Sequence, residues 1–207
     1  MQVGIISAVL EFIVLSLPSG IYLAVQARPR RGSEARTLVA LCWPAANGWI
    51  LAVGVFVTAT GLGYAASRGI AAIHPALLHP GAANPRAVHA GGGTTGLSVA
   101  TATPTGVGGY GAIVLSTLAE EMLFRGFLAG LLIARLGFAW GNAVQAILFL
   151  APHALLLIVS VAFWPLLPAQ LIAGWLLGWL RYRSGSIAPG WVAHAAANIL
   201  APTLLAL

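Results

Sequence analysis

Charged side chains are scarce in this chain of 207 residues: 7% are charged, against roughly 25% in an average soluble domain. Aspartate and lysine are absent altogether. Without aspartate the chain cannot form a Ser-His-Asp triad, and with Cys42 as its single cysteine it can form neither an internal disulfide nor a cysteine pair around a metal. The composition is 59% hydrophobic, which leaves too few polar residues to cover a water-facing surface. It therefore indicates an integral membrane protein.

The ten arginines give the chain a net charge of +6. A basic excess can reflect binding to nucleic acid, but these arginines do not form a cluster interleaved with aromatic residues. In membrane proteins, basic residues more often mark the loops on the cytoplasmic side. We therefore expect the lipid bilayer as a partner, and no nucleic acid.

Six apolar segments are long enough to cross a bilayer as helices, which takes about 20 residues. We predict an all-α fold, a polytopic membrane helical bundle with about six transmembrane helices. The predicted parts are N-terminal transmembrane helices over residues 1–66, a connecting loop rich in proline and glycine over 67–109, and a four-helix core over 110–207. The segments are Val3–Gln26, Ala46–Ala66, Tyr110–Leu136, Gly141–Val161, Trp164–Tyr182 and Ile187–Leu205.

The arginines also predict how the segments are oriented. If the N-terminus lies outside, seven arginines fall at inner connections and two in the outer one, which is the bias of the positive-inside rule. We therefore expect a multi-pass protein with both termini outside, in the cytoplasmic membrane if the host is a bacterium. The inner arginines are Arg28, Arg30, Arg31, Arg36, Arg135, Arg181 and Arg183, and the outer ones are Arg68 and Arg86.

Three smaller features lie in the N-terminal half. The first segment is not expected to be a cleaved leader, because Glu11 interrupts it and arginines follow rather than precede it. The apolar stretch Thr37–Ala45 is expected to form a short interfacial or re-entrant helix. In the long loop, His74, His79 and His89 have spacings of five and ten residues, which match no compact metal-ligand pattern, so we interpret them as solvated.

Two of the four acidic residues, Glu120 and Glu121, are adjacent inside an apolar segment, and Arg125 follows them. One charged side chain at the centre of a membrane helix costs roughly 2.5–3.5 kcal/mol on insertion scales, so this group needs a functional reason. Glu121 and Arg125 are spaced i,i+4 with the acid first, the favourable order for an ion pair. On an α-helix Glu120 points about 100° away from its neighbour. We therefore interpret Glu121–Arg125 as a pair that orients the site and Glu120 as the working carboxylate, a general base.

Further polar groups occur in two other apolar segments. His153 follows Pro152, which removes a backbone donor and can kink its helix, and His194 and Asn198 are spaced i,i+4 on one face. Counted from the inner ends at about 1.5 Å per residue, Glu120 and these three side chains lie roughly 12–22 Å deep. Side chains from three separate helices can thus meet in one cavity.

Three short motifs occur in order, each in its own apolar segment: Glu120-Glu121-x-x-x-Arg125, Phe149-x-x-x-His153 and His194-x-x-x-Asn198. Together they resemble the motifs of the CPBP family, also called Abi, which contains CAAX prenyl endopeptidases and bacteriocin-processing enzymes. The resemblance covers residues 110–207 and implies an intramembrane endopeptidase that cleaves near the C-terminus, or in a leader or sorting tail, of a membrane-associated protein. It also implies that Glu120 activates a water with help from His153, and that His194 and Asn198 stabilise the oxyanion.

Other chemistries stay open at this point. A glutamate and two histidines could bind Zn²⁺, but they come from three helices and no HExxH pair occurs on one, so we favour a glutamate-type mechanism without a cofactor. Intramembrane Glu, His and Arg also line transporters and proton relays, although the chain lacks paired discontinuous helices in two similar halves. The third alternative is a non-catalytic scaffold of the same fold that binds a partner within the membrane.

Overall fold

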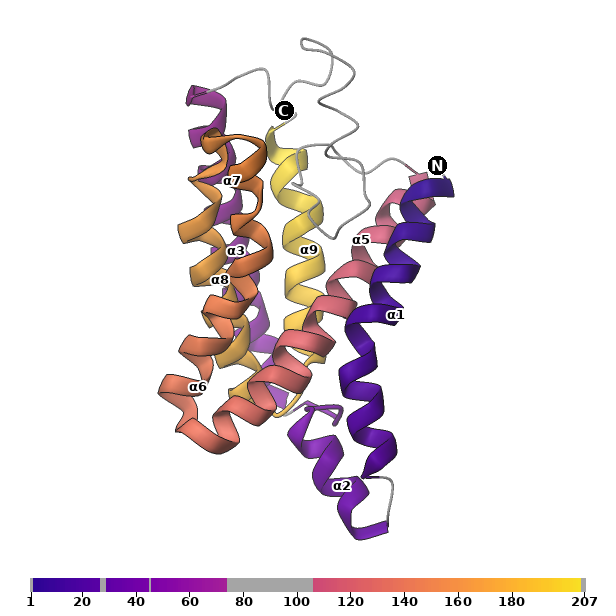
Figure 1. Cartoon of the computed structure of the whole chain (residues 1–207). Helices are drawn as coiled ribbons and strands as arrows, with labels where there is room; N and C mark the ends of the chain where they lie inside the picture. Colours follow the sequence, from indigo (N-terminus) through magenta and orange to yellow (C-terminus); the bar gives the residue numbers. More distant parts are fainter. Residues whose placement is uncertain (1, 27–28, 45, 74–105, 206–207) are drawn as a thin grey trace.

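The computed structural model describes residues 2–26, 29–44, 46–73 and 106–205, and this part of the chain is helical without any β-strand (Figure 1). The all-α prediction is confirmed. Most of the predicted connecting loop, with His74, His79 and His89, lies outside the described residues. The elements are α1 (Gln2–Val25), α2 (Pro29–Leu38), α3 (Ala46–Ile73), α5 (Gly106–Glu120), the π-helix η2 (Glu121–Leu128), α6 (Ala129–Ala154), α7 (Leu156–Val159), the 3₁₀-helix η3 (Val161–Phe163), α8 (Leu166–Ser184) and α9 (Ala188–Leu205).

Four helical stretches in the described residues are long and apolar enough to cross a membrane. They are Ile5–Val25, Ala46–Ile73, Gly106–Val159 and Val161–Ser184. Their outward faces carry large apolar side chains such as Ile50 and Ile158, which are 75% and 83% exposed. Lipid solvates such a surface, and helices satisfy their own backbone hydrogen bonds there. The chain is an integral membrane protein.

The stretch Gly106–Val159 is 54 residues long and turns back at Gly137 (Figure 1). Gly137 has φ 73° and ψ 170°, a conformation that glycine adopts without steric cost. After the turn, Gly141 lies so close to the backbone of Leu132 and Ile133 that a side chain at this position would collide with it. The turn falls between the third and fourth predicted segments.

Helix α3 continues to Ile73 instead of ending at Ala66. Ala66 and Ile70 are buried against an apolar cluster that includes Phe163 of η3 and Leu166 of α8. Because one side of these last turns is packed, the helix persists through residues whose sequence reads as the start of a loop, including the exposed Arg68.

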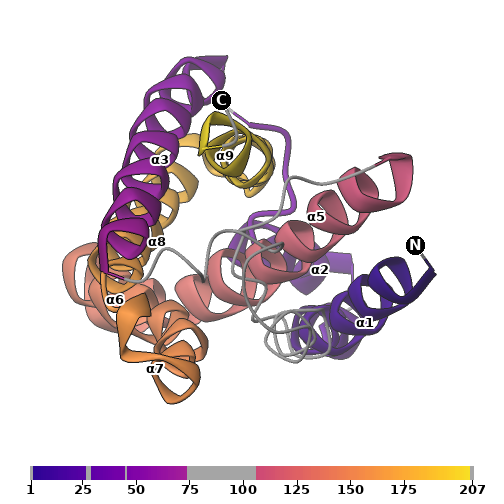
Figure 2. The ribbon, with the colours of Figure 1, turned by 90° about the horizontal axis from the view of Figure 1, so that it is seen from above.

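The helices form two groups (Figure 2). In one, α3, α8 and α9 share an apolar core and α6 packs against α8. The closest approach of α6 and α8 is at Gly178, where a Cβ would overlap the side-chain oxygen of Asn142. In the other, α1 lies against α5 and η2, and contacts between α5 and α9 join the two groups.

The three residues that end and follow α2, Leu38–Ala40, close one end of the bundle, and we call them the inner plug. The carbonyl of Leu38 accepts a hydrogen bond from the guanidinium of Arg181. The carbonyl of Ala40 accepts one from the backbone N–H just before α9, at 3.1 Å. The helix expected over Thr37–Ala45 is wrong: α2 ends at Leu38, because the next residues are buried between helices and direct their carbonyls to other elements.

Candidate active site

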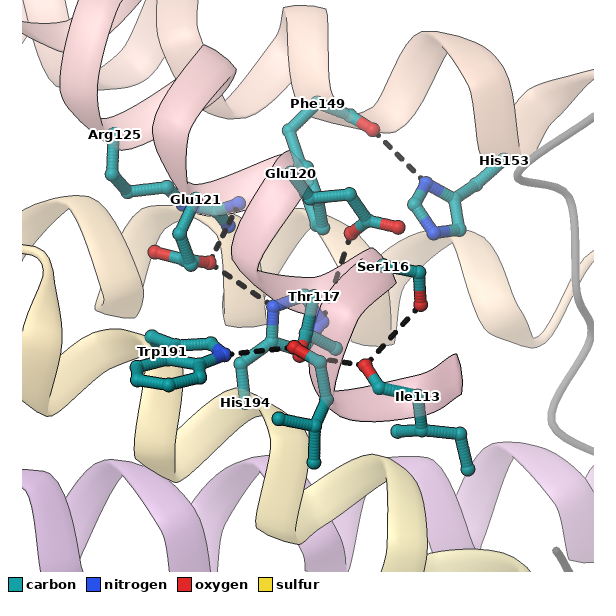
Figure 3. Close-up of polar contacts among 11 residues, drawn as sticks. Ile113, Ser116, Thr117, Glu120, Glu121, Arg125, Phe149, His153, Trp191 and His194 are labelled. Atoms are coloured by element: carbon teal, nitrogen blue, oxygen red, sulfur yellow. Dashed lines mark hydrogen bonds and ion pairs between the residues drawn. The ribbon is translucent and has the colours of Figure 1, made fainter. Parts of the chain in front are cut away.

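The two adjacent glutamates lie at a change of helix type. α5 ends at Glu120, and the π-helix η2 begins at Glu121. A π-helix closes its hydrogen bonds one residue further along than an α-helix, so successive residues turn through less than the roughly 100° of an α-helix. Glu121 is thereby brought toward the side of Glu120, and both carboxylates reach His194 of α9 (Figure 3). The spacing rule for an α-helix did not predict that they share this partner.

Glu121 is completely buried and has two partners. Its Oε1 lies 3.1 Å from Nη1 of Arg125 and 3.0 Å from Nδ1 of His194. Since a carboxylate paired with arginine can only accept, His194 donates from Nδ1–H, and this contact assigns the proton to that nitrogen. The predicted i,i+4 contact is present, and it holds the histidine of a distant helix as well.

Arg125 is completely buried too, and an aromatic ring offsets part of the cost of burying its charge. Its guanidinium carbon lies 3.9 Å from the centre of the Phe149 ring, a cation–π contact. Within the described residues its nitrogens make no hydrogen bond, so the Glu121 charge and the ring face are what stabilise this cation. The ring contact links η2 to α6, since moving α6 away would leave the Arg125 charge with less compensation in an apolar interior.

Glu120 is held more loosely than its neighbour. Its Oε2 lies 3.8 Å from Nε2 of His194, which is too long for a direct hydrogen bond. Its side chain is 15% exposed, while that of Glu121 is 0% exposed. Of the two acids, Glu120 therefore has free acceptor capacity facing His194.

His153 enters the site from α6. Its Nδ1–H donates to the carbonyl of Phe149 at 3.0 Å, which leaves Nε2 of the neutral ring as an acceptor. In Figure 3 the ring projects toward the side on which Glu120 lies. It therefore faces the same site without touching the carboxylates.

Phe149 connects the charged groups. Its ring lies under the Arg125 guanidinium, 4.9 Å from the His153 ring and 6.0 Å from the His194 ring, measured between ring centres. Phe124 of η2 packs edge-on against it at 5.2 Å. The sequence contains Phe149 in a motif, but its role as the contact between three elements comes from the structure.

Asn198 stands apart from the other candidates. It lies on α9, one turn beyond His194 and half-buried, and it makes no hydrogen bond within the described residues. The structure thus brings Glu120, Glu121, Arg125 and His194 into direct contact and places His153 beside them through Phe149. It does not bring Asn198 into contact with them.

Two further residues position the site and had no role in the sequence analysis. Trp191 of α9 donates its indole N–H to the carbonyl of Val114 on α5, at 2.9 Å, and so joins the two helices one turn before His194. Ser19 of α1 donates its hydroxyl to the carbonyl of Met122 at 2.8 Å. Trp191 could have been found from its i,i+3 spacing to His194, whereas Ser19 has no sequence signal because its partner is 103 residues away.

A structural or catalytic zinc ion needs three or four protein ligands close together. Within the described part of the chain, no three His, Cys, Asp or Glu side chains lie close enough to hold one. His153 points its Nδ1 at a carbonyl and His194 points its Nδ1 at Glu121, which leaves Nε2 of each ring available, so the spacing of the side chains and not the orientation of the rings decides the fit. The side chains as placed do not fit a zinc site of three protein ligands.

Replacing Arg125 with glutamine should lower stability strongly, because Glu121 then stays buried with less charge compensation. Removing one partner of a buried ion pair typically costs about 3–5 kcal/mol. We expect a lower midpoint of thermal unfolding in detergent, whereas Arg135→Gln, at an exposed arginine of α6, should leave it unchanged. The double variant Arg125→Gln, Glu121→Gln should recover part of the loss. Equal midpoints of thermal unfolding for Arg125→Gln and Arg135→Gln would contradict this account of the pair.

Part of the chain matches a known protein family. Residues 104–200 match a family model described as Rce1-like, type II CAAX prenyl endopeptidase Rce1-like. The matched segment contains all six candidate residues, from Glu120 to Asn198. No curated protein and no solved structure matches the chain. The resemblance to CPBP enzymes is confirmed: residues 104–200 of this membrane protein are similar to the Rce1-like type II CAAX prenyl endopeptidases, a family of proteases.

Proposed function

We propose that this protein is an intramembrane endopeptidase that hydrolyses a peptide bond near the C-terminus, or in a leader or sorting tail, of a membrane-associated protein. One observation carries the proposal: Glu120 and Glu121 meet His194 inside an apolar bundle, within the segment that matches a protease family. Charged groups at such a depth are costly, and catalysis is a function that needs them there. The partners are a peptide substrate and the surrounding lipid.

Glu120 is the proposed general base. It is the carboxylate without a bonded partner, and His194 holds its Nε2 3.8 Å away, so an attacking water can contact both. Nε2 of His153 is free to accept the other hydrogen of that water, because its Nδ1–H is committed to a carbonyl. As the water attacks the amide carbonyl, its proton passes to Glu120, which returns it to the departing amine.

His194 and Asn198 are the proposed donors to the oxyanion. His194 gives its Nδ1–H to Glu121, so it donates from Nε2 only when both ring nitrogens carry protons. The two carboxylates on either side offset the charge of that form. Asn198 has two amide N–H donors and lies on the same face of α9 one turn away, with no competing partner in the described residues.

We propose six membrane crossings around a four-helix catalytic core made of α5 with η2, α6, α8 and α9. The start of α1 and the end of α9 lie at one end of the bundle, and α2 lies at the other (Figure 1). The arginines at the α2 end, Arg36, Arg135 and Arg183, are exposed, as the positive-inside rule expects of a cytoplasmic face. α9 is apolar apart from its site residues, and is counted as the last crossing.

We expect that Glu120→Gln will abolish processing, because it removes the base while keeping size and shape. Asn198→Ala should slow cleavage by roughly 10²–10³, the usual effect of losing one oxyanion donor. The measurement is mass spectrometry of protein termini in membranes from cells with each variant. Glu34→Gln, the same change at an exposed acid of α2, is the matched control. If no precursor accumulates in the Glu120→Gln membranes, the protein is a scaffold or transporter.

We also propose that cleavage needs no metal. Purified protein that is dialysed against a chelator should hydrolyse a prenylated CAAX peptide at the rate of untreated protein. The proposal rests on the spacing of the site residues: no three His, Cys, Asp or Glu side chains in the described part of the chain lie close enough together to hold one ion. Loss of activity that added Zn²⁺ restores would overturn it.

The topology can be measured with the single cysteine. Cys42 is exposed and follows α2, so a membrane-impermeant maleimide should label it in inside-out vesicles and not in intact cells. In a Cys42→Ser background, Val107→Cys at the start of α5 should show the opposite pattern, since Val107 is 90% exposed and lies at the other end. Labelling of both cysteines from the same side would be incompatible with the proposed crossings.

A further inference from the structure

The π-helix η2 determines where the two carboxylates point. It is eight residues long and carries Glu121 in its first turn and Arg125 near its middle. Helices of this type are rare, and those that occur are mostly short interruptions of α-helices at functional sites. If η2 relaxed to α-helical geometry, each residue would turn through about 100°, and the difference would accumulate along the segment. The rotation would be small at Glu121 and larger at Arg125, and it would weaken their contacts with His194 and Phe149.

A contact from outside the matched segment holds η2. Ser19 of α1 is 1% exposed, and its hydroxyl donates to the carbonyl of Met122, the residue after Glu121, at 2.8 Å. No other side chain in the described residues donates a hydrogen bond to the backbone of η2. The bond therefore acts on the first turn, where the change from α5 to η2 occurs.

The inner plug holds η2 at a second point. Gly126 is buried, and a Cβ at this position would lie 3.2 Å from the carbonyl oxygen of Val39 and 3.6 Å from the hydroxyl of Ser19. The missing side chain thus lets α1 and the inner plug approach the same turn of η2. We call Ser19, Val39 and Gly126 the η2 clamp.

Ser19 could also be an ordinary polar contact between two membrane helices, and such contacts stabilise the bundle without directing a reaction. Two features indicate a role beyond stabilising the bundle. The acceptor carbonyl adjoins a carboxylate of the site, and the segment it belongs to has a helical geometry that needs outside support. Ser19 is not itself a nucleophile, since it is buried and its hydroxyl is used on Met122.

We propose that Ser19 is a positioning residue: by holding the carbonyl of Met122, it keeps η2 in π-helical geometry and so keeps both carboxylates on His194. The residue acts through Glu121 and does not touch the substrate. The kinetic part of this inference rests on the proposed function, and the histidine contact does not. The N-terminal helices therefore contribute to catalysis by setting the angle between Glu120 and Glu121.

The test compares Ser19→Ala with Ser16→Ala, a serine of the same helix whose hydroxyl bonds only to the carbonyl of Ile13 in its own helix. With a fluorogenic prenylated CAAX peptide, Ser19→Ala should lower kcat about 10- to 100-fold with KM unchanged, since a small misplacement of a reacting group can cost about 10² in rate. Ser16→Ala should match the wild type, and all three proteins should unfold at similar temperatures. With a wild type that cleaves the peptide, equal kcat for the two variants would overturn the inference.

A second measurement is independent of activity. The ¹⁵N signals of His194 in the full-length protein, assigned with His194→Gln, should show a ring protonated on Nδ1 in the wild type and in Ser16→Ala. In Ser19→Ala they should shift toward a mixture of tautomers, because the Glu121 contact is weakened. An unchanged His194 spectrum would overturn the inference. A shifted spectrum together with no precursor accumulation in Glu120→Gln membranes would uphold the positioning role and reject the proposed function.

A third variant tests the contact between Gly126 and Val39 in the η2 clamp. Gly126→Ala places a methyl group 3.2 Å from the Val39 carbonyl oxygen, so η2 or the inner plug must move by a few tenths of an ångström, whereas Gly111→Ala on α5 meets its nearest neighbour at an ordinary 3.7 Å. Gly126→Ala should reproduce the His194 shift of Ser19→Ala, and Gly111→Ala should not. A Gly126→Ala spectrum like that of the wild type would contradict a clamp that controls η2.

Discussion

Glu121 can be buried completely in this bundle because Arg125 and His194 contact the same oxygen, at 3.1 and 3.0 Å. Removing a carboxylate and a guanidinium from water costs several kcal/mol each, and only close pairing offsets that cost. The pairing requires η2 and α9 to stay at a fixed distance, and the Phe149 ring under Arg125 extends the requirement to α6. Much of the architecture keeps these three elements in contact.

Contacts elsewhere in the chain keep η2, α6 and α9 in these positions. Trp191 joins α9 to α5, Gly178 lets α6 reach α8, and the inner plug bonds to Arg181 and to the start of α9. The helices before residue 104 lie outside the family match, yet α1 and the inner plug both contact η2. Membrane helices gain little from apolar contact with one another, so close backbone approach and single polar bonds have a large share in setting their positions.

Much of this was predictable from local sequence. Helical segments found from apolar runs agree with the structure to within a few residues at most ends, because lipid requires long apolar helices whatever their neighbours. The Glu121–Arg125 contact followed from i,i+4 spacing. The end of α3 was missed, since burial of Ile70 by η3 and α8 extends a helix whose sequence reads as a loop. The helix expected at Thr37–Ala45 was wrong for a similar reason. Residues distant in the chain bury the inner plug and donate hydrogen bonds to its carbonyls.

The sequence by itself determined the membrane class, the helical fold and the set of ionisable residues, because composition, length and spacing act locally. Only the tertiary structure decided how those residues are paired. The π-helical geometry that turns Glu121 toward His194 has no local signature; it depends on Ser19 and Gly126 contacts between segments about a hundred residues apart in the chain. Helix register is a cooperative property of packed neighbours, so the angle between two adjacent carboxylates was set by α1, which carries neither of them.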